Sequence, residues 1–380
     1  MGRIYQRVRT PFRMGTRRAP SLEVDAMENR IVVGTLNSPS CQVSSQVSAH
    51  FETMELEGLE HSVTSVQDFE SGIESLSEGG LDLLAIPAAE IFGREGEISA
   101  KGCQVIGART PRRPSLVLVS PDRLMYQPKS AIIVSDSGLV RRQLLRARPD
   151  LQATSSEKLG GIVHGFKLPA DSRDLPRKLA ELLEGGEIDG FVISRAEYDG
   201  SGQTERRHTL MPQPKERGAP HFLPRPYSDL IAVVSRVGFP NRHAAILTES
   251  EGNTVLWVQS RIMGDFDPSI HDFVGMEVRH RQVGAILRQA EANRDLVLEQ
   301  SCHDPDGEIY HDEVRVEIRI ETISQDGRRT LSLERLVAMS EYQRAVIALL
   351  MDWRVLVTES TREVPRDHPT DDDAPPFIPE

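Results

Sequence analysis

Residues 81–86, Leu81-Asp82-Leu83-Leu84-Ala85-Ile86, form a short apolar run directly after the glycine pair Gly79-Gly80. Runs of this kind are typical of strands that a parallel sheet buries on both faces. The preceding residues 67–77 carry Phe69, Ile73 and Leu76 at helical spacing, and the glycine pair ends that helix. Residues 30–35, Arg-Ile-Val-Val-Gly-Thr, predict an earlier strand, with a helix over 38–51 capped by Asn37 or Ser38. This order of strand, helix and strand predicts a βαβ unit.

The same pattern starts again further along the chain. Residues 131–134 predict a strand, and residues 139–148 predict a basic helix that ends before Pro149. A second helix over 177–183 and a strand over 191–193 complete this unit. The apolar run at 230–234 predicts a strand that returns to the first domain.

A third region shows a different pattern. Residues 314–320, Val-Arg-Val-Glu-Ile-Arg-Ile, alternate between apolar and charged side chains, which predicts a half-exposed strand. A closing helix is expected from Leu336 to Leu350. The fold class predicted is α/β, with two periplasmic-binding-like βαβ domains around a cleft plus a smaller α+β C-terminal domain. The expected boundaries are a basic tail (1–28), domain 1 (29–125 and 223–247), domain 2 (126–200), an exposed loop (201–222), domain 3 (250–358) and an acidic, proline-rich tail (359–380).

Composition narrows the classes of function. The chain has 380 residues and a formal charge of −12, which argues against nucleic acid as a partner. No apolar run is long enough for a membrane span, so no membrane partner is expected. Three scattered cysteines give neither a disulfide framework nor a metal site, which indicates a cytoplasmic setting. The first twenty residues hold six arginines and no acidic residue, and they are interpreted as either a transit peptide or a disordered tail.

Several short motifs occur in a fixed order. Residues 34–39 read Gly-Thr-Leu-Asn-Ser-Pro, and residues 140–143 read Val-Arg-Arg-Gln, followed by Arg-Pro-Asp-Leu at 148–151. Residues 186–193 read Gly-Glu-Ile-Asp-Gly-Phe-Val-Ile, and Arg109 opens an arginine-rich turn. Together these motifs resemble those of the hydroxymethylbilane synthase (porphobilinogen deaminase) family over about residues 30–240, and more loosely to 350.

The resemblance implies an enzyme that joins porphobilinogen units into a linear tetrapyrrole on a dipyrromethane cofactor. It implies a cleft in which arginines bind the carboxylates of the pyrroles, because guanidinium groups bind carboxylates bidentately. The residues that the resemblance assigns to carboxylate binding are Ser38, Arg109, Arg141, Arg142 and Arg177, with Arg173 as a competitor for the last position. The expected molecule is a monomer.

The chain departs from the family pattern at the positions that carry the chemistry. Leu36 stands where the family has its first-loop arginine. Ala89 replaces the family's lysine, and Glu90 replaces the catalytic aspartate. Arg281 stands where the family attaches its cofactor to a cysteine. Cys103 lies in a sequence that looks more like the cofactor loop, but chain order places it in the first domain, where a packing role is favoured.

Three hypotheses follow. The first is a divergent hydroxymethylbilane synthase in which Glu90 acts as acid, base and charge stabiliser. The second is a catalytically inactive relative that binds a carboxylated pyrrole or another polycarboxylate between its first two domains. The third is an unrelated anion-binding protein with a periplasmic-binding-like architecture.

Overall fold

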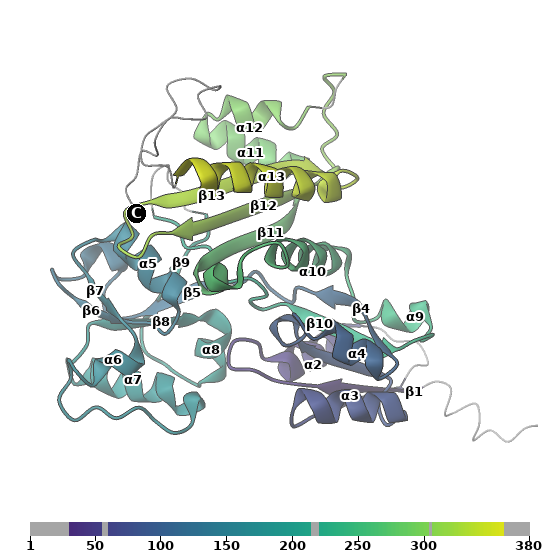
Figure 1. Cartoon of the computed structure of the whole chain (residues 1–380), viewed down its shortest axis with the longest axis horizontal. Helices are drawn as coiled ribbons and strands as arrows, with labels where there is room; N and C mark the ends of the chain where they lie inside the picture. The colour runs from purple at the N-terminus through teal and green to yellow at the C-terminus, as the bar shows by residue number, and fades with distance from the viewer. Residues whose placement is uncertain (1–29, 55–59, 214–219, 304–305, 361–380) are drawn as a thin grey trace, which may run out of the picture.

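The computed structural model describes residues 30–54, 60–213, 220–303 and 306–360. Within this part of the chain three separate sheets form, and each belongs to one domain. Two of the domains stand side by side, and the third lies across them (Figure 1). The basic segment 1–28 and most of the acidic segment 359–380 lie outside the described residues. No helix in the described ranges is both long enough and apolar enough to cross a membrane.

The first domain contains a five-stranded sheet in the order β2-β1-β3-β10-β4. β1 runs parallel to β2 and β3, whereas β10 runs antiparallel to both β3 and β4. The strand expected at 81–86 is β3, and all five of its residues are buried, as a strand covered on both faces requires. The elements are β1 (Arg30–Thr35), α2 (Val43–Thr53), β2 (Glu60–Ser65), α3 (Phe69–Glu78), β3 (Leu83–Pro87), α4 (Glu95–Ala100), β4 (Cys103–Arg109), β10 (Ile231–Arg236) and α9 (Asn241–Ala244).

The second domain repeats this plan with the order β7-β6-β8-β5-β9. β6 runs parallel to β7 and β8, and β5 runs antiparallel to β8 and β9. Its elements are β5 (Leu116–Val119), β6 (Ile132–Val134), α5 (Gly138–Ala147), β7 (Gln152–Thr154), α6 (Ser156–Leu159), α7 (Leu175–Glu184), β8 (Gly190–Ser194), α8 (Arg195–Gly200) and β9 (Arg207–Leu210).

The strands β5 and β9 correct two expected boundaries. The second sheet already begins at Leu116, ten residues before the expected start of domain 2 at 126. Residues 207–210, expected in an exposed loop, pair with β5 and bury Leu210. β9 is an edge strand whose residues, Arg-His-Thr-Leu, form no apolar run, whereas β5, Leu-Val-Leu-Val, carries the apolar run of a buried strand and was not predicted. The division of the remaining chain into domains stays a prediction.

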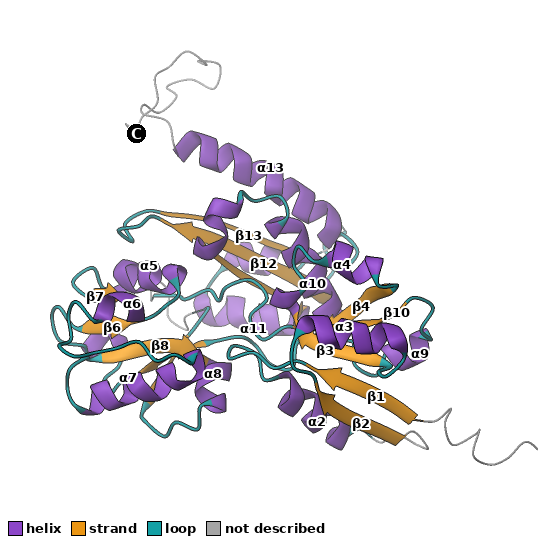
Figure 2. Ribbon diagram, turned by 60° about the horizontal axis from the view of Figure 1, so that its bottom comes forward, coloured by secondary structure: helices purple, strands orange, loops and turns teal. Residues whose placement is uncertain are grey.

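The third domain has an antiparallel sheet, β11-β12-β13, with helices on both faces (Figure 2). The half-exposed strand expected at 314–320 is β12. The closing helix begins six residues later than expected, because Leu336 belongs to β13. The elements are α10 (Ser250–Met263), β11 (Val274–Gln282), α11 (Val283–Asn293), α12 (Leu296–Gln300), β12 (Val314–Ile323), β13 (Thr330–Ala338) and α13 (Tyr342–Ser360).

The hydrophobic cores join the three domains unequally. One cluster runs from the first sheet, through Leu84 and Val234, to Val258 of α10 and Trp353 of α13. The second domain instead has two clusters of its own, one on each face of its sheet. The first and third domains therefore share a core, whereas the second domain is joined to them by two chain crossovers, by polar contacts and by local packing such as that of Leu139 of α5 beside Gly275 of β11.

Candidate functional site

A cleft of about 360 Å³ lies where the first two domains meet. The first domain contributes the loops that follow β1 and β2, and the second contributes residues around the start of α7 and residues from both ends of the short helix α8. Ligands of α/β proteins bind at the carboxyl ends of parallel strands, which is where these loops lie. The lining residues are Leu36, Asn37, Ser38, Pro39, Gln42, Ser65, Val66, Gln67, Ser172, Arg173, Pro176, Glu197, Gly200 and Ser201.

The loop after β1 is held in one shape by its own hydrogen bonds. The backbone N–H groups of Ser38 and Cys41 each donate to the other residue's carbonyl, at 3.0 and 3.2 Å. The cap expected at Asn37 or Ser38 is wrong, because α2 begins at Val43 and its N-cap residue is Gln42; Asn37 Oδ1 nevertheless accepts from the N–H of Ser44 in its first turn at 2.8 Å. The first turn of α2 contains no acidic residue, which leaves the positive end of its dipole towards the cleft uncompensated.

Two charged side chains of opposite sign line this cleft. Arg173 is exposed and comes from the short turn before α7, and Glu197 is half-buried in the first turn of α8. Within the described part of the chain, neither the guanidinium of Arg173 nor the carboxylate of Glu197 has an ion-pair partner. Burial and, to a smaller extent, the nearby Asp136 carboxylate raise the pKa of Glu197 to about 6, against the hydrogen bond at Ser194, which lowers it. An unpaired carboxylate with a raised pKa in a cleft is typical of functional sites.

A second pocket of about 260 Å³, called the inner pocket below, lies beside the cleft and is lined mainly by the second domain. Pro176 and Glu197 line both spaces. The inner pocket lies at the carboxyl ends of β6 and β8. Its walls include Val134, Val140 and Leu179, which are at most 3% exposed.

The two crossovers between the lobes meet beside the cleft. Arg112, on the way from β4 to β5, donates from Nε to Asp229 Oδ2 at 3.0 Å and from Nη1 to Asp199 Oδ2 at 2.9 Å. Asp229, on the way back to β10, is 3% exposed, and burial raises its pKa although Arg112 opposes this. Cys41 is buried nearby, and burial, followed by the Asp229 charge, raises the pKa of its thiol to about 12.

The structure brings two of the sequence-predicted residues into the cleft, Ser38 and the competing candidate Arg173. Arg141 lines an adjoining depression of about 470 Å³, and its Nη1 donates to the Ser135 carbonyl at 2.6 Å. Glu90 ends a single 3₁₀ turn after β3, and it does not line the cleft, the inner pocket or this depression.

The other predicted arginines have structural partners. Arg109 contacts His50 at 3.3 Å and Glu249 at 3.7 Å, both at the junction with α10. Arg142 donates to the carbonyl of Ile323 at 2.7 Å and stacks on the ring of Phe273, so it binds the third domain. Arg177 is 72% exposed and pairs with Asp174 at 2.9 Å.

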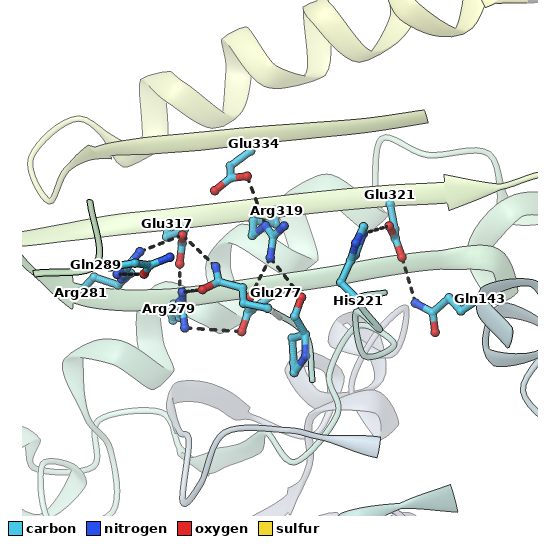
Figure 3. A network of polar contacts seen from close by, with 12 residues as sticks. Gln143, His221, Glu277, Arg279, Arg281, Gln289, Glu317, Arg319, Glu321 and Glu334 are labelled. Atoms are coloured by element: carbon cyan, nitrogen blue, oxygen red, sulfur yellow. Dashed lines mark hydrogen bonds and ion pairs between the residues drawn. The ribbon is translucent and has the colours of Figure 1, made fainter. Parts of the chain in front are cut away.

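Arg281, at the position that the resemblance assigned to cofactor attachment, belongs to an ionic network on the third sheet (Figure 3). Its Nη1 lies 3.2 Å from Glu317 Oε1, and its Nη2 donates to Gln289 at 2.6 Å. Arg279 also pairs with Glu317. Cys103 is 1% exposed within β4, and burial raises its pKa. Neither position presents a reactive thiol to the cleft.

Glu197 was missed by sequence reasoning, although a signal was present. Residues 194–197 read Ser-Arg-Ala-Glu directly after a predicted strand, which is the spacing of a helix N-terminus with Ser as its cap. Ser194 Oγ does accept from the N–H of Glu197 at 3.0 Å. Among the described residues, no group of three or more His, Cys, Asp or Glu is placed to hold a metal ion.

No family model matches the chain, and no curated protein matches it. Solved structures similar to it include a putative methionine-binding lipoprotein from Bacillus subtilis, with 11% identity, a TM-score of 0.32, and coverage of 59% of this chain and 92% of that one. A periplasmic substrate-binding protein of an ABC transporter from Coxiella burnetii has 14% identity and a TM-score of 0.31, with 61% and 95% covered. Immunogenic lipoprotein A from Vibrio vulnificus has 13% identity and a TM-score of 0.32, with 61% and 98% covered.

The predicted fold class is confirmed: two α/β domains that resemble those of periplasmic binding proteins, and a smaller domain with a three-stranded sheet. The predicted membership of the hydroxymethylbilane synthase family is wrong: no family model matches the chain, and the similar structures are named as lipoproteins and as a periplasmic substrate-binding protein. The expected polymerisation of porphobilinogen is corrected with it. The cytoplasmic location is corrected as well, since those structures are named as lipoproteins or as periplasmic. The dipyrromethane cofactor and the monomeric state remain untested predictions.

Proposed function

We propose that this protein binds a small charged organic molecule in the cleft between its first two domains. The observation that carries the proposal is the pair formed by Arg173 and Glu197, which line one cleft and have no ion-pair partner within the described residues. Charged groups that remain unpaired in a cleft are stabilised when a ligand supplies the opposite charge. The volume of about 360 Å³ falls within the range of small-molecule sites.

The positions of the two charges predict the poles of the ligand. An anionic group, such as a carboxylate, suits Arg173 and the N-terminus of α2, whose first turn has no acidic residue. A cationic group suits Glu197, because Asp136 adds a second negative charge to this side of the cleft. A ligand with carboxylates at both ends would instead place one of them against Glu197. The geometry therefore favours a zwitterion over the polycarboxylate of the second hypothesis.

The neutral lining suits a ligand that forms several hydrogen bonds. Asn37, Gln42 and Gln67 present amides to the cleft, and four serines present hydroxyl groups. Amide and hydroxyl groups both donate and accept, so they fix the orientation of a small polar molecule without adding net charge.

The test is calorimetry on the full chain with zwitterionic amino acids, dicarboxylates and diamines. Zwitterions are expected to bind more tightly than molecules with two like charges. Arg173→Ala and Glu197→Gln are each expected to weaken binding about tenfold or more, whereas the exposed Arg177→Ala serves as a control one helical turn away. If all three classes fail to bind, or if Arg177→Ala is as harmful as Arg173→Ala, the proposal is wrong.

A further inference from the structure

The inner pocket differs in character from the cleft beside it. Val134, Val140, Leu179 and Val192 form its apolar walls and are 1–3% exposed, and the rest of its lining includes five serines and the charged residues Asp136, Glu197 and Arg225. The apolar walls come from β6, α5, α7 and β8, so the pocket is formed by packed secondary structure. Its volume is about 260 Å³. Water against such walls lacks hydrogen-bond partners, so an apolar group that displaces it gains free energy.

Apart from Glu197, several of the polar groups that line this pocket already have partners in the protein. Ser137 Oγ accepts from the N–H of Val140 at 3.3 Å, and Ser194 Oγ caps α8 in the same way. Both carboxylate oxygens of Asp136 accept from the hydroxyl of Ser156 at 2.8 Å. A polar ligand group that entered the inner pocket would lose its bonds to water and find these acceptors occupied.

The pocket is also placed where a bound zwitterion would reach it. Glu197 and Pro176 line both the cleft and the inner pocket, so the two spaces lie next to each other at the group expected to bind the cationic pole. A substituent on the carbon between ammonium and carboxylate can then point into the inner pocket.

We propose that the ligand is an α-amino acid with an apolar side chain, and that the inner pocket selects it by accepting that side chain. This inference rests on the proposed function, since it assumes that Arg173 and Glu197 hold the two charged poles. Each methylene group that contacts the apolar walls is expected to strengthen binding. A hydroxyl, amide or carboxylate side chain is expected to weaken it, because the acceptors around the pocket are already occupied.

The experiment is a homologous ligand series measured by calorimetry on the unmodified full chain. Alanine, 2-aminobutyrate, norvaline and norleucine differ by one methylene each, and each step is expected to strengthen binding about fourfold until the pocket is full. Serine and glutamate are expected to bind more weakly than norvaline. This series needs no variant, so a variant that failed to fold would leave the test intact.

Two substitutions on α7 locate the effect. Leu175 lines the inner pocket and Leu183 does not, although both are half-buried and pack against the same core. Leu175→Asn is expected to weaken norleucine about tenfold and alanine by less than about twofold. The matched control Leu183→Asn is expected to change neither affinity by more than about twofold.

The outcomes separate the two proposals. The inference would be overturned if affinity did not change with side-chain length, or if serine or glutamate bound more tightly than norvaline. Binding that still depended on Arg173 would in that case support the proposed function of the cleft. If no amino acid binds at any length, the inference falls as well. Binding of dicarboxylates or diamines that still depended on Arg173 or Glu197 would then keep the cleft and change its ligand.

Discussion

Arg112 and Asp229 tie together the two chain segments that cross between the first and second domains. The guanidinium lies on the outgoing crossover and the carboxylate on the returning one, 3.0 Å apart. Because the first and third domains share a hydrophobic core and the second does not, these crossovers carry much of the link between the lobes that form the cleft. The pair is thus placed to set how the two halves of the ligand site face each other.

Replacing Arg112 with leucine is expected to lower the free energy of unfolding by about 2–3 kcal/mol at pH 7, because Asp229 would remain buried without its partner. Burial already raises the pKa of Asp229, so folding favours the protonated form of this carboxyl group relative to the unfolded chain. The loss is therefore expected to shrink as the pH falls towards 5, which urea unfolding at the two pH values would measure.

The control for this change is Arg177→Leu, which breaks the exposed pair with Asp174. Exposed ion pairs contribute little, so a change of less than about 0.5 kcal/mol is expected. Equal losses in the two variants would contradict the importance assigned to Arg112.

Glu321 of β12 joins the second and third domains (Figure 3). It accepts from Gln143 at 2.9 Å, from Arg146 at 2.7 Å and from His221 at 2.8 Å. Burial alone would raise the pKa of Glu321, but the His221 and Arg146 contacts outweigh it and lower the pKa to about 2. The depressed value means that this carboxylate stabilises the fold above about pH 4.5 and that the stabilisation is lost as the pH falls towards 2.

Glu321→Gln is accordingly expected to cost on the order of 3 kcal/mol at pH 7, and the difference from the unmodified protein should close between pH 4.5 and 2. Thermal or urea unfolding across that range measures it. Glu78→Gln, at the exposed end of α3, should change stability by no more than about 0.5 kcal/mol. A difference that stayed constant with pH would show that the Glu321 contacts do not involve its charge.

Local sequence patterns predicted the sheets better than the site. β3 and β6 could be predicted because a continuous apolar run is itself a local signal. β9 could not, since it is an edge strand with only one apolar residue in four, whereas β5 carries the same local signal in residues 116–119 and was not predicted. The cleft depends on which loop edges face each other, and that is a property of the assembled domains.

The arginine motif at 140–143 shows how sequence likeness misled. Arg142 and Gln143 do not reach into the cleft but bind the third domain, through Ile323 and Glu321. The same residue types can bind a ligand carboxylate or a neighbouring domain, because guanidinium and amide groups donate equally well to either. Only the packing of α5 against β12 decides between these roles.

The pH dependence of ligand binding is expected to follow Glu197. Burial and the neighbouring Asp136 raise its pKa to about 6, so it is ionised at pH 8 and largely protonated at pH 5. If Glu197 holds the cationic pole, affinity should be constant above about pH 7 and fall roughly tenfold per pH unit well below 6. Calorimetry from pH 5 to pH 8 tests this. Glu197→Gln should bind weakly at every pH, whereas the exposed Glu184→Gln should keep the dependence of the unmodified protein.

The three cysteines are expected to be inert in the folded protein. Each is at most 2% exposed, burial raises the pKa of all three thiols, and that of Cys41 reaches about 12. Since the thiolate is the reactive form, iodoacetamide at pH 8 should leave the native chain unmodified and alkylate three positions in denaturant. Intact mass measurement gives both numbers, and it would also reveal any pyrrole adduct on the purified chain. Alkylation of Cys41 in the native protein would contradict its burial beside Asp229.

Gly252 fixes the docking of the third domain onto the first. It lies in the first turn of α10, and a Cβ atom there would come within 2.4 Å of the Ala108 carbonyl oxygen and 2.7 Å of the Arg109 Cα atom. Both are backbone atoms of β4, held in place by the Glu249 N–H donating to the Ala108 carbonyl at 3.0 Å and the Ala108 N–H donating to Asn253 Oδ1 at 2.7 Å. Gly252→Ala should therefore destabilise the protein by about 1–3 kcal/mol, although alanine favours helix by up to about 1 kcal/mol.

The matched change is Gly96→Ala in α4, where no heavy atom lies within 4 Å of the added Cβ, and a gain of up to about 1 kcal/mol is expected. Urea unfolding of both variants decides the matter, because a helix-propensity effect alone would stabilise both, whereas steric exclusion at β4 gives them opposite signs.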